Sequence, residues 1–252
     1  MVEIKEVVKT YDETVVVDHV SMSIPKGKIT SFIGPNGAGK STLLSIISRL
    51  IAKDEGEVFV DDQEVSAANS KELAKKLSIL KQANHINVRL TVRQLVSFGR
   101  FPYSQGRLTE YDEQMVDQAI RYMELEDLED KYLEQLSGGQ KQRAHIAMVI
   151  AQDTDYILLD EPLNNLDMKH ASQIMKVLRQ LVDELGKTVV IVLHDVNFAS
   201  VYSDYIVALR DGKIIKKGTT EEIIDNGVLK EVYDMDIKIH DIDQCRICLY
   251  FN

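Results

Sequence analysis

A glycine-rich loop between an apolar run and an apolar-periodic helix constrains this chain most. It reads Gly-Pro-Asn-Gly-Ala-Gly-Lys-Ser-Thr over residues 34–42, directly after the apolar run 29–33. The glycines let successive N–H groups point at phosphate oxygens, and the start of the following helix adds partial positive charge. The complete pattern predicts a nucleoside triphosphate site. We expect it to be formed by Gly34, Pro35, Asn36, Gly37, Ala38, Gly39, Lys40, Ser41 and Thr42.

Two residues of this loop carry specific chemistry. The Lys40 ammonium is expected to contact the β- and γ-phosphates as a point charge, and the Ser41 hydroxyl to ligate Mg²⁺. A purely structural glycine turn is disfavoured because the whole motif lies between a strand and a helix. The sequence therefore predicts ATP and Mg²⁺ as cofactors, with Lys40 counted among the catalytic residues.

Two acidic residues follow a second apolar run. Asp160 and Glu161 come directly after residues 156–159, which predict a parallel strand buried on both faces. The carboxyl ends of such strands form the sheet edge that binds ligands. We expect Asp160 to act on Mg²⁺ through its coordination shell, and Glu161 to orient the attacking water and accept its proton. On their own, two such acids could equally be a charge pair at a helix N-terminus.

The later part of the chain alternates strand and helix signals. Apolar residues recur at steps of three and four between residues 174 and 185 and predict a helix that Gly186 ends. Residues 188–193 predict another buried strand. Residues 2–60 are rich in strand signals, with a further strand pair at 57–65, whereas 70–152 is mostly helical. This alternation predicts an α/β fold with a parallel sheet and right-handed crossovers.

Composition and charge limit the partners and the location. The chain has 252 residues and a net charge of −10, which disfavours nucleic acid as a partner. No run approaches the ~18 apolar residues that a membrane span needs, and the first residues lack the apolar region of a signal peptide. We therefore expect a cytoplasmic protein whose membrane role, if any, comes through a partner.

Two charge runs and one cysteine pair leave alternatives open. Residues 81–107 carry only basic charges apart from histidine, and residues 110–134 are strongly acidic. These runs predict either two solvated faces or a docking surface for a partner.

Cys245 and Cys248 lie three apart in a predicted terminal strand, so they face opposite sides. Two small apolar residues are favoured there over a metal or redox pair.

The segment Leu-Ser-Gly-Gly-Gln at residues 136–140 resembles the signature motif of ABC ATPases. Its serine and glycines precede a helix predicted over 140–152, so they offer a hydroxyl, N–H groups and a helix dipole to an anion. The resemblance implies that this second anion site completes the ATP site of another subunit, so that a homodimer encloses two ATP molecules. The residues concerned are Ser137, Gly138, Gly139 and Gln140.

The other motifs of that family follow in register from about residue 2 to 235. Tyr11 lies where the family stacks an aromatic ring on adenine, although it could be an ordinary surface residue. Gln82 matches the glutamine that reaches Mg²⁺ and moves with the membrane partner, although it could be a plain polar loop residue. His194, which follows the strand 188–193, matches the histidine placed near the γ-phosphate.

Residues 164–167 resemble the loop that crosses the dimer interface, and Asp167 belongs to it. Asn164 departs from the pattern, because many relatives carry serine at that position. The resemblance implies a P-loop NTPase core with a parallel sheet, an antiparallel β subdomain on the N-terminal side and an inserted helical subdomain. We expect one domain over 1–252, with the core at 1–82 and 153–252 and the helical subdomain at 83–152.

The segment Thr-Val-Arg-Gln-Leu-Val-Ser-Phe-Gly-Arg-Phe-Pro-Tyr at 91–103 resembles importers of iron-siderophores, haem and vitamin B12. Within that group it is most similar to catecholate or petrobactin-type siderophore importers of Gram-positive bacteria. The resemblance implies an ATPase on the cytoplasmic face of the membrane, bound to two transmembrane permease subunits and served indirectly by an extracellular substrate-binding protein. The alternatives are a haem or vitamin B12 importer and a non-transport ATPase of the iron–sulfur assembly type.

Overall fold

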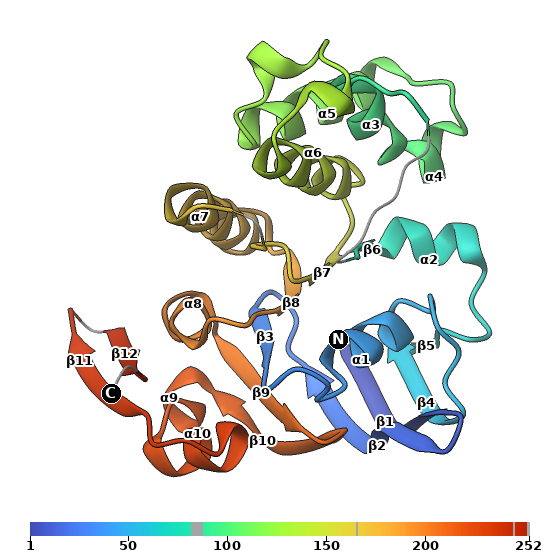
Figure 1. The fold of residues 1–252 in the computed structure, drawn as a ribbon. Helices are drawn as coiled ribbons and strands as arrows, with labels where there is room; N and C mark the ends of the chain where they lie inside the picture. Colours follow the sequence, from blue (N-terminus) through green and yellow to red (C-terminus); the bar gives the residue numbers. More distant parts are fainter. Residues whose placement is uncertain (82–87, 165, 244, 251–252) are drawn as a thin grey trace. The chain divides into compact units, whose positions relative to one another are not determined.

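The computed structural model describes residues 1–81, 88–164, 166–243 and 245–250, which form two compact units (Figure 1). Unit 1 comprises Met1–Ala68 and Thr188–Asn252, and unit 2 comprises Asn69–Lys187. None of the helices in the described part of the chain has the length and hydropathy of a membrane span. Whether residues 83–152 form a subdomain of their own stays a prediction.

Unit 1 contains the predicted antiparallel sheet (Figure 1). Its strand order is β2 (Thr14–Ile24), β1 (Val2–Tyr11), β4 (Glu55–Val60) and β5 (Gln63–Glu64). The turn between β4 and β5 falls at Asp61 and Asp62, both with positive φ, as aspartate in turns tolerates.

Parallel strands form the centre of unit 1. Strand β3 (Ile29–Ile33) pairs in parallel with β8 (Thr188–Val192) on one side and with β9 (Tyr205–Arg210) on the other. Every residue of β3 and β8 is buried, as the two apolar runs predict for strands covered on both faces. Strand β10 (Lys213–Thr219) adds an antiparallel edge to β9.

Four helices and a hairpin complete unit 1. They are α1 (Lys40–Ile47), α8 (Val196–Tyr202), α9 (Thr220–Ile223), α10 (Asn226–Tyr233), β11 (Lys238–Ile242) and β12 (Cys245–Leu249). Strand β12 confirms the predicted terminal strand. Cys248 is buried and Cys245 half-buried, and burial raises the pKa of the Cys248 thiol to about 11. The described residues contain no cluster of three or more potential metal ligands.

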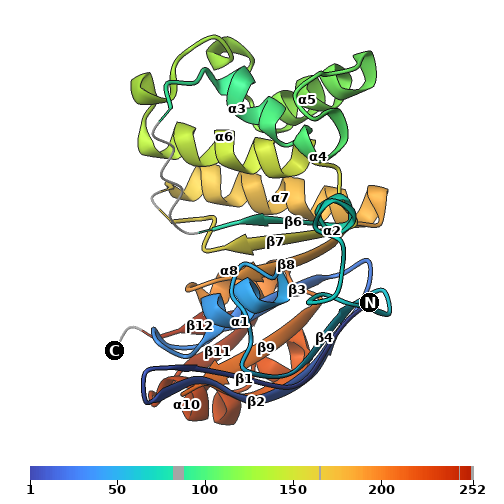
Figure 2. The same cartoon turned by 90° about the vertical axis from the view of Figure 1, so that its right-hand side faces the viewer.

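Unit 2 contains two parallel strands, β6 (Leu77–Leu80) and β7 (Tyr156–Asp160), which lie side by side (Figure 2). Its longest helix, α7 (Met168–Leu185), ends at Gly186 as predicted but starts six residues before the first predicted position. The other helices of unit 2 are α2 (Ser70–Lys76), α3 (Val92–Phe98), α4 (Phe101–Ser104), α5 (Glu110–Tyr122) and α6 (Gly138–Ala151). Two short 3₁₀ helices, Glu126–Leu128 and Leu133–Gln135, precede α6.

Two arginines of the basic run, Arg93 and Arg100, pair with carboxylates of the acidic run. The Arg93 guanidinium lies 3.1 Å from the Glu113 carboxylate and 3.0 Å from that of Glu129, and it also binds Asp117. All three partners belong to the acidic run. Arg93 therefore fits neither of the two alternatives, a solvated face or a docking surface. Its ion pairs connect α3 to the segments that follow it in the chain.

Arg100, which also belongs to the basic run, is a buried arginine. Its side chain is 2% exposed, and its Nε donates to Asp112 Oδ1 at 2.8 Å. Its NH1 group donates to the carbonyl of Ala151 at 3.0 Å. The preceding Gly99 is required for close packing, because a Cβ there would lie 2.1 Å from the carbonyl oxygen of Met148. The Gly-Arg pair in the importer-like segment is therefore a packing element between α4, α5 and α6.

Replacing Arg100 tests this packing role. Arg100→Met leaves the Asp112 carboxylate buried without its cation, so we expect the free energy of unfolding to fall by about 3 kcal/mol. Urea denaturation measures the change. Arg107→Met, at an exposed position of the same run, should change stability by no more than about 0.5 kcal/mol. Equal stability of the two variants would contradict the role given to Arg100.

Mild acid should destabilise the chain through His145. Burial lowers the pKa of this imidazole below its ordinary value of 6.5, and Nε2 has no hydrogen-bond partner among the residues that the structure describes. Because the unfolded chain then binds the proton more tightly, stability decreases as the pH falls below 6.5. The loss is at most about 1.4 kcal/mol per pH unit, down to the folded-state pKa.

Urea unfolding of the parent and of His145→Gln over about pH 7.5 to 5.5 measures this effect. The variant should show a smaller decrease in stability, since glutamine does not titrate. His240→Gln, which replaces an exposed histidine, is the matched control. An unchanged pH dependence in His145→Gln would show that His145 does not contribute.

Candidate nucleotide-binding site

The glycine-rich loop follows β3, and at two of its glycines both the backbone conformation and the space around it exclude a side chain. Gly34 has φ of 138° and Gly39 has φ of 90°. A Cβ at Gly34 would lie 2.0 Å from the carbonyl oxygen of Leu209, and one at Gly39 would lie 2.4 Å from that of Val16. The loop is therefore fixed by direct backbone contact with β9 and β2.

The N-cap of α1 differs from the N-caps of most other helices that the structure describes. Its N-cap residue is Gly39, which has no side chain to accept hydrogen bonds from the first turn. By contrast, side chains cap helices α2, α3, α5, α6, α7, α8 and α10, through Asn69, Thr91, Thr109, Ser137, Asp167, Asp195 and Asp225. The N–H groups at a helix start need an acceptor, so the start of α1 fits a phosphate group.

Lys40 lies inside the loop. Its side chain is almost fully buried, and Nζ donates to the carbonyl oxygens of Gly34 at 2.7 Å and Pro35 at 2.8 Å. The ammonium is thus held where the loop curves around it. A buried cation beside a side-chain-free helix N-terminus matches the charge of a triphosphate.

His194 follows the strand next to β3. Phe32 pairs with Val192, and the N–H of Leu193 donates to the carbonyl of Phe32 at 3.1 Å. His194 and the glycine-rich loop therefore leave neighbouring parallel strands at the same end. Tyr11, at the end of β1, is 44% exposed, and the Lys9 ammonium lies over its ring, 5.4 Å from the ring centroid.

Asp160 and Glu161 stand at the carboxyl end of β7, as predicted. Asp160 is the last residue of the strand and Glu161 follows it, and both are buried. Glu161 has φ of 50°, a left-handed conformation that is uncommon for a residue with a side chain. Its Oε2 atom accepts a hydrogen bond from Asn164 Nδ2 at 2.6 Å.

The predicted signature segment opens α6 two residues earlier than expected. The Ser137 hydroxyl accepts from the N–H of Gln140 at 3.3 Å, while Gln140 Oε1 accepts from the N–H of Ser137 at 2.9 Å. This capping box draws Gly138 and Gly139 into the first turn, so the prediction of a start at Gln140 was wrong. A Cβ at Gly138 would meet no atom within 4 Å, so the turn is open.

Asp167 caps α7 and thereby explains its early start. The Asp167 carboxylate accepts from the N–H of His170 at 2.9 Å and contacts its Nδ1 at 2.8 Å. These contacts hold the pKa of Asp167 below its usual range, with the backbone hydrogen bond as the largest cause.

Gln82 lies outside the described residues. The site residues thus divide between unit 1, with the glycine-rich loop, Tyr11 and His194, and unit 2, with Asp160, Glu161, Asp167 and the signature segment.

Tyr233 is a site residue that the motifs do not reveal. The N–H of Gly34 donates to its hydroxyl oxygen at 3.1 Å, so the last residue of α10 holds the first residue of the phosphate loop. Burial raises the pKa of Tyr233 above its usual range, so the phenol stays protonated. The two residues are 199 positions apart, and no local sequence signal connects them.

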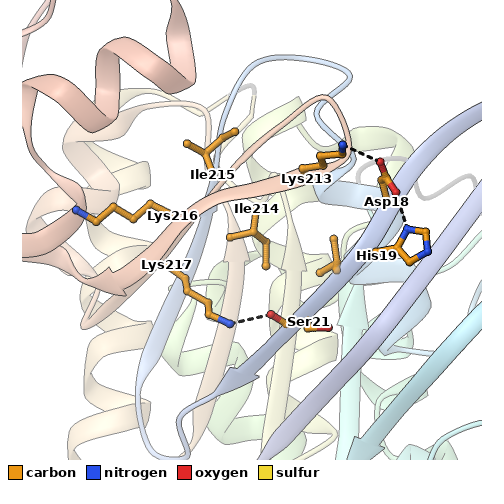
Figure 3. Close-up of a pocket in the computed structure, with 9 residues that line it drawn as sticks. Asp18, His19, Ser21, Lys213, Ile214, Ile215, Lys216 and Lys217 are labelled. Atoms are coloured by element: carbon orange, nitrogen blue, oxygen red, sulfur yellow. Dashed lines mark hydrogen bonds and ion pairs between the residues drawn. The ribbon is translucent and has the colours of Figure 1, made fainter.

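A groove in unit 1 contains none of the predicted site residues. Residues 18–21 of β2 and 213–217 of β10 line it (Figure 3). Lys213 Nζ lies 3.2 Å from Asp18, and Lys217 Nζ donates to the carbonyl of Ser21 at 2.7 Å (Figure 3). These two lysines join the edge strands of the two sheets, so the groove is a seam of the fold.

Comparison with known proteins identifies the class to which this fold and site belong. Residues 17–164 match the family model described as ABC transporter. The chain belongs to the ABC transporter family and is one of its ATP-binding, ATP-hydrolysing subunits.

Individual relatives show which kind of ABC transporter subunit this chain resembles. The chain is 69% identical over 252 residues to the petrobactin import ATP-binding protein YclP of Bacillus subtilis, with 100% of both chains covered. It is 51% identical over 239 residues to the petrobactin import ATP-binding protein FatE of Bacillus anthracis, covering 95% of this chain and 96% of that one. The ATP-binding cassette MJ0796, solved as a dimer bound to ADP and Pi, has a TM-score of 0.80 at 34% identity, covering 87% of this chain and 99% of that one. These comparisons confirm the predicted fold class.

Removing the Tyr233 hydroxyl tests its hold on the loop. Tyr233→Phe leaves the Gly34 N–H without its acceptor, at a cost of about 1 kcal/mol. We expect the affinity for ATP to fall about fivefold as the loop becomes less ordered. Titration with a fluorescent ATP analogue measures it. Tyr205→Phe is the control, because the Tyr205 hydroxyl makes no hydrogen bond within the described residues. Affinity equal to that of the control would contradict the role of Tyr233.

Proposed function

We propose that this chain powers the import of a ferric siderophore of the petrobactin or catecholate type through a membrane permease. The observation that carries the proposal is the full-length similarity, at 69% identity, to a protein named for petrobactin import. The importer-like segment at 91–103 supports it, and the intact loop, acids and histidine support an active ATPase.

The residues of unit 1 receive the nucleotide in this proposal. Lys40 and the start of α1 neutralise the β- and γ-phosphates, while Tyr11 stacks on the adenine. His194, which leaves the strand beside β3, contacts the γ-phosphate. A Mg²⁺ ion bound with ATP would offset part of the negative charge of the phosphates. The donors that suit this hard cation are Ser41, Asp160 and Gln82, which supply oxygen atoms.

Glu161 performs the proton transfer in this proposal. Its carboxylate orients a water molecule toward the γ-phosphate and accepts the proton as the water attacks. Burial excludes competing solvent around this carboxylate, and the left-handed backbone at Glu161 sets the direction in which its Cα–Cβ bond leaves the main chain. Lys40 stabilises the charge that develops on the phosphate oxygens.

The proposed assembly is a homodimer on two permease subunits. The open first turn at Ser137, Gly138, Gly139 and Gln140 of one copy meets the ATP held by the other, and Asp167 lies at the interface. The helical part at 83–152 and Gln82 face the permease, which places the chain at the cytoplasmic side of the membrane. An extracellular binding protein acts on the chain only through the permease, and no nucleic acid is involved.

Reconstitution tests the proposal. The chain, a candidate siderophore permease and its binding protein are placed in liposomes with ATP and Mg²⁺. We expect ferric petrobactin on the binding protein to raise ATP hydrolysis several-fold and to drive uptake of iron. Ferric hydroxamates, haem and vitamin B12 are the comparison substrates.

Two results would overturn parts of the proposal. Stimulation by haem or vitamin B12 alone would replace the siderophore with that substrate. ATP hydrolysis that no substrate stimulates, with co-purification of iron–sulfur assembly proteins, would favour the non-transport reading. Glu161→Gln is the internal control, since it should abolish turnover and retain ATP binding.

A further inference from the structure

Asn164 contacts the carboxylate that the proposed mechanism uses as a base. Its Nδ2 atom lies 2.6 Å from Glu161 Oε2. An ionised carboxylate only accepts hydrogen bonds, so the amide must present its NH₂ group to it. The amide oxygen of Asn164 therefore points away from Oε2, and one oxygen of Glu161 is fixed by a donor from its own chain.

The backbone around this contact is held from two directions. The N–H of Asn164 donates to the carbonyl of Glu161 at 3.3 Å and closes a tight turn. Gln142 Nε2 of α6 donates to the carbonyl of Pro162, in the middle of the turn, at 3.0 Å. The turn is thus connected to the helix that the signature segment opens.

The left-handed φ of Glu161 makes such support necessary. A residue with a side chain adopts this conformation at a cost of roughly 1–3 kcal/mol, and it persists only where neighbouring groups hold it. The turn supplies the backbone contacts, and the Asn164 amide supplies the side-chain contact. The amide contact restrains rotation of the Glu161 carboxylate about its side-chain bonds, which the backbone conformation does not restrain.

We propose that Asn164 is a positioning residue that fixes the Glu161 carboxylate for attack by water. The amide does so through its hydrogen bond to Oε2. The inference rests on the proposed role of Glu161. It assigns to Asn164 a part in hydrolysis and none in ATP binding.

The test compares Asn164→Leu and Asn164→Asp in the reconstituted transporter. Leucine keeps similar volume without a donor, whereas aspartate places a second carboxylate against Oε2. We expect kcat for ATP to fall at least about tenfold in both variants, with more loss in Asn164→Asp, because a misplaced catalytic group loses about this much rate. The KM for ATP should stay within about twofold of the parent, since the residue touches only the hydrolytic group.

A reversed pair separates positioning from stability. In the double variant Glu161→Gln with Asn164→Asp, the amide at 161 donates to the carboxylate at 164, so the hydrogen bond is restored in the opposite direction. Thermal stability should return toward that of the parent, while kcat should stay as low as in Glu161→Gln alone. Asn226→Asp, at an exposed position, controls for the added charge.

The outcomes distinguish the two proposals. If Glu161→Gln is inactive and Asn164→Leu turns over within twofold of the parent, the inference about Asn164 is wrong and the base remains. If kcat and ATP affinity fall together in Asn164→Leu, the residue supports folding or binding and the inference is also wrong. If Glu161→Gln keeps full turnover, the proposed role of Glu161 itself fails.

Discussion

Backbone contact at two glycines is the constraint on which the nucleotide site depends. The carbonyl oxygens of Leu209 and Val16 occupy the space that Cβ atoms at Gly34 and Gly39 would need. These carbonyls belong to β9 and β2, so the loop lies against strands of both sheets of unit 1. A side chain at either glycine would have to displace main chain, and Lys40, which bonds to the loop carbonyls, would move with it.

Ion pairs hold segments of unit 2 together, as backbone contacts hold the phosphate loop of unit 1. Arg93 and Arg100 bind carboxylates that follow 12 to 36 residues later, and Arg100 does so in a fully buried position. The segment that resembles siderophore importers is therefore partly a set of packing residues.

The sequence predicted the buried strands and the motifs at their ends, and it missed contacts that depend on the exact local backbone or on a distant partner such as Tyr233. Mostly apolar runs predicted β3, β7 and β8, and the glycine-rich loop, Asp160 and Glu161 stand at strand ends as expected. Helix starts were predicted too late, because capping by Ser137 brings two glycines into α6 and capping by Asp167 brings residues 168–173 into α7. The contact of Asn164 with Glu161 was also missed, since it depends on the left-handed backbone at Glu161. The place of Gln82 stays a prediction, because it lies outside the described residues.

The hydrogen bond between Gly34 and Tyr233 has a consequence for how the chain is made. The loop leaves the ribosome early, whereas its tyrosine partner is 199 residues further on, and β3 also waits for β8 and β9. A nascent chain therefore carries the phosphate-binding residues for most of its synthesis without the strands and hydroxyl that shape them. The complete site exists only after translation of α10, so the growing polypeptide reaches that point before nucleotide can stabilise the finished loop.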